Sequence, residues 1–87
     1  MKRDKKRVEA HRDTLVGCER VKSSLGEGRS CYISEVEQMW NFELRWDFRL
    51  QKKCWVKTGK PFYDFRVEVV DDEGNHRIWA GTSVSPA

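Results

Sequence analysis

Apolar side chains recur at helical spacing through the first quarter of the chain. One stripe of such a helix carries Val8, His11, Leu15, Cys18 and Leu25, with Val21 beside it. The pattern predicts an amphipathic helix over residues 4–24. Gly26 and Gly28 follow the last apolar residue and suit a left-handed cap, so the helix is expected to end there. Its basic opening lies at the positive end of the helix dipole, so residues 1–6 are expected to fray.

Apolar and polar residues alternate from residue 42 to residue 56. The apolar members all have even numbers: Phe42, Leu44, Trp46, Phe48, Leu50, Cys54 and Val56. Such alternation is typical of a strand with one buried face. It predicts a single strand of about fifteen residues, against a usual length of five or six, with its even-numbered residues facing the helix. A bend is expected near Lys52, where the apolar face becomes charged.

Shorter elements surround this strand. Residues 31–33 read as a short strand, and residues 58–61 and 71–75 read as turns. Inward-facing positions of the last two strands are Tyr63, Phe65, Val67 and Val69, then Ile78 and Ala80. Residues 34–40 leave two alternatives, because Ser34 and Glu37 have capping-box spacing for a helical turn while a bulged strand fits equally well.

These elements predict an α+β fold in which an N-terminal helix packs on a curved four-stranded antiparallel sheet, in the order α-β-β-β-β. At 87 residues and 10.3 kDa the chain is expected to be a single domain, 1–87, with residues 83–87 as a flexible tail. The hydrophobic fraction of 38% is close to the charged fraction of 36%, so a thin core must rely on large aromatic side chains.

Matching the inward faces of the strands fixes a register. It places Trp55 opposite Asp64, Val56 opposite Tyr63, Val69 opposite Ile78 and Glu68 opposite Trp79. Several aromatic and cationic side chains then share the face that points away from the helix. These predicted partner-binding residues are Lys53, Trp55, Lys57, Phe62, Arg66, Arg77 and Trp79. The alternative is that the rings of Trp55 and Trp79 lie over neighbouring Lys and Arg stems and only stabilise the sheet.

Charge is distributed in alternating blocks. The formal net charge is +3, but residues 1–22 and 51–60 each carry +4, whereas residues 23–50 carry −2 and residues 61–87 carry −3. A protein that coats phosphate backbones usually gathers a basic face with few acids, whereas mixed blocks suit orientation on a protein partner.

The favoured function is therefore a non-enzymatic adaptor or inhibitor that docks on a protein partner, and a component of nucleic-acid machinery is one such partner. Small binders of this kind are common among phage and mobile-element proteins. A homodimer is left open. The second hypothesis is binding of RNA or single-stranded DNA by a basic hairpin at 51–63. Its phosphate-binding residues would be Lys52, Lys53, Lys57 and Lys60, together with Lys5, Lys6 and Arg7. A third is a small ribonuclease-like enzyme using His76, Glu68 and Arg66.

Other chemistry finds little support. Three dispersed cysteines argue against a secreted disulfide framework and for a reducing, cytoplasmic setting. The charged N-terminus resembles neither a signal peptide nor a membrane anchor, so no membrane partner is expected. His11 and Cys18 alone are a weak ligand pair, and the glycine-containing loop at 26–30 follows a helix rather than preceding one. No metal and no cofactor are expected.

Overall fold

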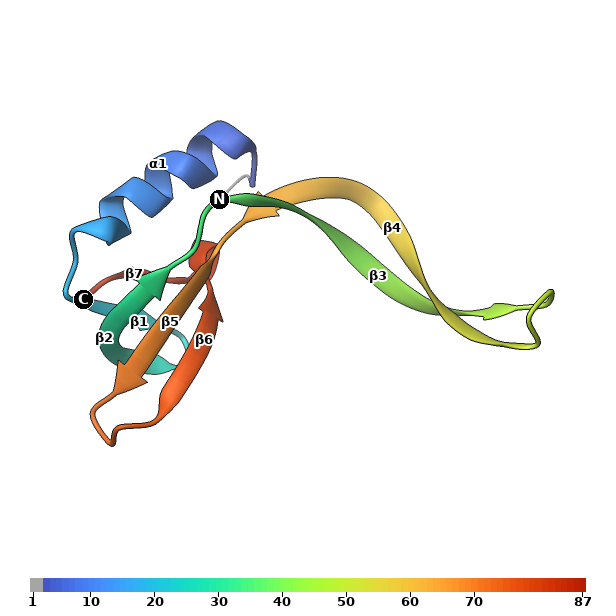
Figure 1. Ribbon diagram of the computed structural model, residues 1–87. Helices are drawn as coiled ribbons and strands as arrows, with labels where there is room; N and C mark the ends of the chain where they lie inside the picture. Colours follow the sequence, from blue (N-terminus) through green and yellow to red (C-terminus); the bar gives the residue numbers. More distant parts are fainter. Residues whose placement is uncertain (1–2) are drawn as a thin grey trace.

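The computed structural model describes residues 3–87 and divides them between a five-stranded sheet covered by one helix and a two-stranded hairpin that projects from it (Figure 1). The Cα radius of gyration is 16.0 Å, whereas about 12 Å is typical of a compact chain of this length. The α+β class with an N-terminal helix and antiparallel strands is confirmed. The predicted four-stranded sheet is wrong, because the chain forms seven strands in two sheets.

The helix α1 spans Lys5–Val16 and is shorter than predicted. Asp4 caps its start by accepting a hydrogen bond from the Arg7 backbone N–H at 3.0 Å, and Gly17 ends it. The chain then reverses, so Val21 is buried from a strand rather than from the helix. Fraying was predicted for residues 1–6. Residues 1 and 2 lie outside the described part, and the helix is capped from Asp4 onward.

The larger sheet has the strand order β6-β5-β2-β1-β7, and every neighbouring pair is antiparallel. Its strands are β1 (Arg20–Ser23), β2 (Gly26–Ile33), β5 (Arg66–Asp71), β6 (His76–Ala80) and β7 (Ser85–Pro86), with a 3-10 turn η1 (Gly81–Ser83) before β7. Residues 83–87, predicted as a flexible tail, contain β7 and the buried Val84.

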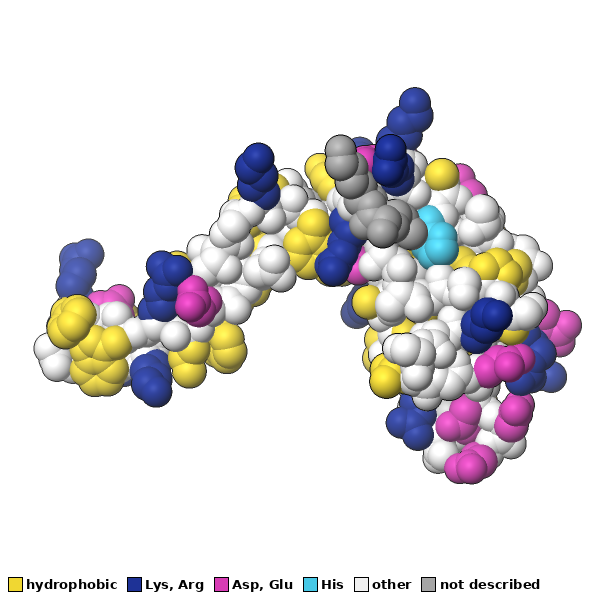
Figure 2. Space-filling view, turned by 180° about the vertical axis from the view of Figure 1, so that it is seen from behind, with side chains coloured by type: hydrophobic (Ala, Val, Ile, Leu, Met, Phe, Trp, Pro, Cys, Tyr) yellow, Lys and Arg dark blue, Asp and Glu magenta, His cyan; other side chains and the backbone are white. Residues whose placement is uncertain are grey.

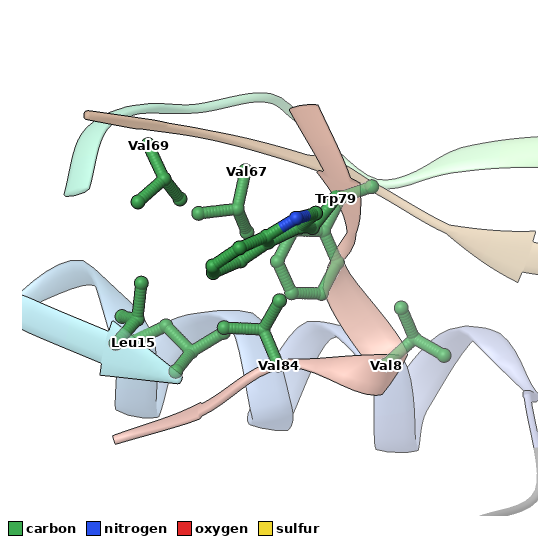
Figure 3. Packing of buried hydrophobic residues seen from close by; sticks show 8 residues of the cluster. Val8, Leu15, Val67, Val69, Trp79 and Val84 are labelled. Carbon is green, nitrogen blue, oxygen red and sulfur yellow. The ribbon is translucent and has the colours of Figure 1, made fainter. Parts of the chain in front are cut away.

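The core lies between α1 and one face of this sheet (Figure 3). Its buried members are Val8, Leu15, Val21, Phe65, Val67, Val69, Trp79 and Val84. His11 closes one side of the core. Its Nε2 lies 3.1 Å from the Gly81 carbonyl oxygen and 2.7 Å from that of Val84. Because both partners only accept, Nε2 carries the hydrogen and donates, and His11 is a packing residue.

The predicted fifteen-residue strand is wrong, because a turn at residues 48–51 divides it. Strand β3 spans Glu37–Asp47 and β4 spans Lys52–Asp64. The Asp47 carboxylate accepts from the backbone N–H groups of Arg49 and Leu50, at 2.8 and 3.2 Å, and Gln51 adopts a positive φ of 52°. Residues 37–40 belong to β3, so the bulged-strand alternative holds and the helical turn does not.

Residues 58–61 form a bulge inside β4, not the predicted turn. Between the pairs Met39↔Phe62 and Asn41↔Thr58, strand β3 has one residue and β4 has three. Gly59 takes up the irregularity with φ of 69°, and Pro61 lies where no ladder hydrogen bond is needed. The predicted pairing of Val56 with Tyr63 is therefore wrong, since both residues lie on β4.

The pairing of β5 with β6 is shifted by one residue from the predicted register. Val67 pairs with Trp79 and Glu68 pairs with Ile78. The shift exchanges the two faces of β6 relative to the prediction, since successive side chains of a strand point to opposite sides. Trp79 is therefore only 5% exposed in the core, and Ile78 is 63% exposed on the opposite face.

Candidate functional site

The projecting hairpin, residues 37–64, is called the arm. Between residues 41 and 57 every side chain is exposed except those of Asp47 and Cys54, which are half-buried. Most of the large exposed apolar side chains of residues 3–87 lie on it: Phe42, Leu44, Trp46, Phe48, Leu50, Trp55 and Val56. Figure 2 shows hydrophobic side chains gathered near the end of the arm, away from the body.

The register of β3 with β4 sorts these side chains onto two faces. Cross-strand pairs share a face, and the pairs are Phe42↔Lys57, Leu44↔Trp55 and Trp46↔Lys53. These six residues are called the aromatic face. The opposite, polar face carries Asn41, Glu43, Arg45, Asp47, Lys52, Cys54, Val56 and Thr58.

The two faces differ in electrostatics. The aromatic face has two ammonium groups and no carboxylate. Lys57 places its Nζ 5.0 Å from the centroid of the Trp40 ring, a cation–π distance. On the polar face the Arg45 guanidinium lies 2.8 Å from the Glu43 carboxylate. The carboxylates that could repel an anionic ligand or attract a cationic one thus lie behind the aromatic face.

The aromatic side chains also pack on one another near the turn. The rings of Trp46 and Phe48 are 6.4 Å apart and nearly perpendicular, with an interplanar angle of 78°. Edge-to-face pairs of this kind stabilise aromatic clusters modestly. Trp46 is still 49% exposed and Phe48 79% exposed, so about half of the Trp46 surface and most of the Phe48 surface stay available.

Only three of the seven predicted partner-binding residues come together. Lys53, Trp55 and Lys57 share the aromatic face of the arm. Phe62 is half-buried at the base of the arm, where the Arg3 guanidinium lies 4.6 Å from its ring. The other three lie on the body: Arg66 is exposed on β5, Arg77 lies 3.5 Å from the Asp71 carboxylate, and Trp79 is buried. The prediction that Trp79 points outward is wrong, because of the register shift.

Sequence reasoning assigned Phe42, Leu44 and Trp46 to the core, yet they form the β3 half of the aromatic face. The available signal was Asp47, a residue whose side chain readily caps a turn, followed five positions later by Lys52 and then Lys53. The alternation of even-numbered apolar residues continues through Phe48 and Leu50, and it concealed the turn.

The predicted phosphate-binding residues form two groups. Lys52, Lys53, Lys57 and Lys60 follow one another along β4, whereas Lys5, Lys6 and Arg7 are exposed in the first turn of α1. The start of the described chain reaches the base of the arm, where the Tyr63 backbone N–H donates to the Arg3 carbonyl at 2.9 Å. Lys52 follows the turn at the far end. The β4 group therefore runs from the turn toward the base of the arm, whereas the α1 group lies beside the base alone (Figure 1).

The predicted ribonuclease residues share the face of the larger sheet opposite the core. Glu68 pairs with Ile78, and His76 pairs with Val70 two residues along β5. The side chains of Arg66, Glu68 and His76 are all exposed. Within residues 3–87 no hydrogen bond or ion pair joins Arg66, Glu68 and His76 to one another, so these groups are not assembled as an acid and base pair.

Comparisons with family models, with curated proteins and with solved structures find no match to this chain. Within the part of the chain that the structure describes, no helix has the length and apolar character needed to cross a membrane.

Proposed function

We propose that the protein is a non-enzymatic interaction module, an adaptor or inhibitor, that docks on a protein partner through the aromatic face of its arm. One observation supports this most: seven large apolar side chains are exposed on the part of the hairpin beyond its base, where nearly every side chain between residues 41 and 57 is exposed. An isolated two-stranded hairpin is marginally stable in water, and apolar patches of this kind mark interaction sites.

The arm offers enough surface for a specific interface. Phe42, Trp46, Phe48 and Trp55 are 54, 49, 79 and 69% exposed. With roughly 200 Å² for each aromatic side chain, they present on the order of 500 Å². A standard interface covers about 800 Å² of each partner, and neighbouring leucines and lysine stems supply much of the remainder.

The composition of the aromatic face favours a protein partner. Interface centres are rich in aromatic residues and poor in charge, with a polar rim. Leu44, Trp46 and Trp55 provide such a centre, and Lys53 and Lys57 lie at its edge. The odd number of cysteines supports a reducing, cytoplasmic setting for the interaction.

Single-stranded nucleic acid is the second candidate. The observation that favours it is the interleaving of Trp46 and Trp55 with Lys53 and Lys57 on a face without carboxylates. Aromatic rings of this kind stack on bases, while the ammonium groups meet phosphates. This candidate predicts that binding weakens steeply with salt, whereas an apolar protein interface retains most of its affinity.

The test compares capture of partners from lysate of the native cells by three forms of the full chain. Trp55→Ala should weaken binding by about 2 kcal/mol, roughly thirtyfold, on the scale of an interface hot spot. Val56→Ala is the matched control, since Val56 is the next residue along β4 and lies on the polar face. Its capture should equal that of the unaltered chain.

A photocrosslinking amino acid at position 44 and another at position 45 then locate the contact. Crosslinks to a protein other than a second copy of this chain, from position 44 alone, support the proposal. Equal losses with both alanine variants, or crosslinks from position 45 alone, would contradict it. Capture that disappears after nuclease treatment would favour the nucleic-acid candidate instead.

A further inference from the structure

No strand among residues 3–87 pairs with the outer edge of β3. The smaller sheet contains only β3 and β4 among residues 3–87, so β3 leaves one row of backbone N–H and C=O groups without a neighbouring strand, while the outer row of β4 is met near the base by the Arg3 carbonyl. Such edges readily accept another strand, and proteins usually protect them with lysine, proline or a bulge.

The two edges of the arm differ in protection. Strand β4 has four lysines, Lys52, Lys53, Lys57 and Lys60, as well as the bulge at Gly59 and Pro61. Strand β3 has no lysine, proline or glycine over its eleven residues. Of the two edges, that of β3 is therefore the one able to accept a further strand.

The sequence of β3 is complementary to itself when read in the opposite direction about Leu44. Antiparallel pairing of two copies with Leu44 opposite Leu44 places Phe42 opposite Trp46 and Glu43 opposite Arg45. It also places Asn41 opposite Asp47. Aromatic residues then meet aromatic residues and acids meet bases, both favourable cross-strand pairs in antiparallel sheets.

The neighbouring registers lose this complementarity. A shift that centres the axis on Glu43 brings two glutamates together, and a shift that centres it on Arg45 brings two arginines together and sets Glu43 opposite Asp47. Registers that pair odd with even positions would set aromatic-face residues beside those of the polar face. Among these registers, charge and face therefore both favour the axis at Leu44.

We infer that the arm binds a second copy of the same chain by antiparallel pairing of β3 with β3 about a two-fold axis at Leu44. The interface is isologous, since each copy contributes the same edge. The product is a four-stranded sheet in the order β4-β3-β3-β4. Four strands with a common apolar face are more stable than an isolated hairpin, which the arm would otherwise remain.

The pairing also enlarges the aromatic face. Phe42, Leu44 and Trp46 from both copies form its centre, with one Trp55 at each side and the lysines outside. Edge pairing uses backbone groups in the sheet plane, so this face stays open to a partner. The dimer therefore does not depend on the proposed function.

The test is the mass of the full chain in solution by sedimentation equilibrium across a concentration series. The unaltered chain should dimerise, at twice its 10.3 kDa. Either single reversal, Glu43→Arg or Arg45→Glu, sets like charges opposite one another twice and should raise the dimer dissociation constant about tenfold or more. Lys60→Glu makes the same change in net charge as Arg45→Glu, away from the β3 edge, and should leave the constant unchanged.

The decisive step is to combine the two charge reversals, either by mixing the single variants or in one double variant. A mixture of the two single variants sets arginines opposite glutamates and should form heterodimers, and the double variant Glu43→Arg/Arg45→Glu should recover the homodimer. The inference is overturned if the unaltered chain is monomeric throughout, if Lys60→Glu weakens the dimer equally, or if neither combination restores association. Trp55→Ala separates the two proposals, since it should weaken partner capture and leave the dimer intact.

Discussion

Trp79 and Trp55 provide the sharpest test of the fold, because the same substitution should have opposite consequences at the two positions. Trp79 is 5% exposed and packs in the core, whereas Trp55 is 69% exposed on the arm. Burial of a side chain of about 240 Å² at 25 cal/mol/Å² gives an upper bound near 6 kcal/mol for Trp79. Truncation of buried aromatic residues to alanine usually costs about 3 to 5 kcal/mol.

Such a loss is large for this chain. A domain of 87 residues is expected to have a free energy of unfolding of roughly 4 to 13 kcal/mol, so Trp79→Ala should leave the body barely stable or unfolded. Trp55→Ala should cost no more than about 1 kcal/mol, since it removes surface that is already hydrated.

Urea unfolding followed by far-ultraviolet circular dichroism measures both variants without depending on tryptophan emission. All forms are compared at one protein concentration, because association would shift the midpoints. The midpoint for Trp79→Ala should fall by more than about 1.5 M, and that for Trp55→Ala should change little. A larger loss with Trp55→Ala than with Trp79→Ala would refute the observed register of β5 with β6.

Two further predictions concern glycine packing and acid stability. A Cβ on Gly28 would lie 2.7 Å from the Val70 carbonyl oxygen, whereas one on Gly17 meets no atom within 4 Å. Gly28→Ala should therefore lower the free energy of unfolding by about 1 to 3 kcal/mol, and Gly17→Ala should not lower it. The pKa of Asp71 lies below its ordinary value of 3.8, chiefly because the carboxylate accepts from the Asn75 backbone N–H. The stability it contributes is present above that ordinary pKa and is lost as the pH falls through the lowered one. Asp71→Ala should therefore destabilise the protein at neutral pH, and the difference in unfolding midpoint should vanish in strong acid.

The α+β class and the first part of the helix stripe were predictable because Val8 and Leu15 recur at helical spacing and both are buried. The predicted continuation to Leu25 was wrong, since α1 ends at Val16 and Leu25 is exposed. The arm was not predictable, for a physical reason. Its turn at residues 48–51 contains no glycine, proline or asparagine, and the alternation of apolar residues passes straight through it. Side-chain period alone cannot distinguish one buried strand from two exposed strands joined by such a turn.

The register error at Trp79 has a related origin. Pairing of β5 with β6 depends on how many residues the turn between them uses, and sequence patterns fix that number poorly. The Asp71 carboxylate accepts from the Glu73 and Asn75 backbone N–H groups, which sets the loop and pairs Val70 with His76. Of the candidate site, Lys53, Trp55 and Lys57 were found together because they lie on one stretch of strand. Their β3 neighbours could be found only from the cross-strand register.

Strands β2 and β5, which flank the arm in sequence, are themselves antiparallel neighbours, with Ile33 opposite Val67. Glu37 of β3 then faces Asp64 of β4 a few residues further on. The arm is thus the distal half of one long ribbon whose proximal half belongs to the body. Its reach is set by the number of cross-strand pairs, each adding about 3.3 Å. Removing two residues from each strand would shorten it by about 7 Å and keep both faces in phase, while removing one would invert them. The span of the arm can therefore change in steps without redesign of the core.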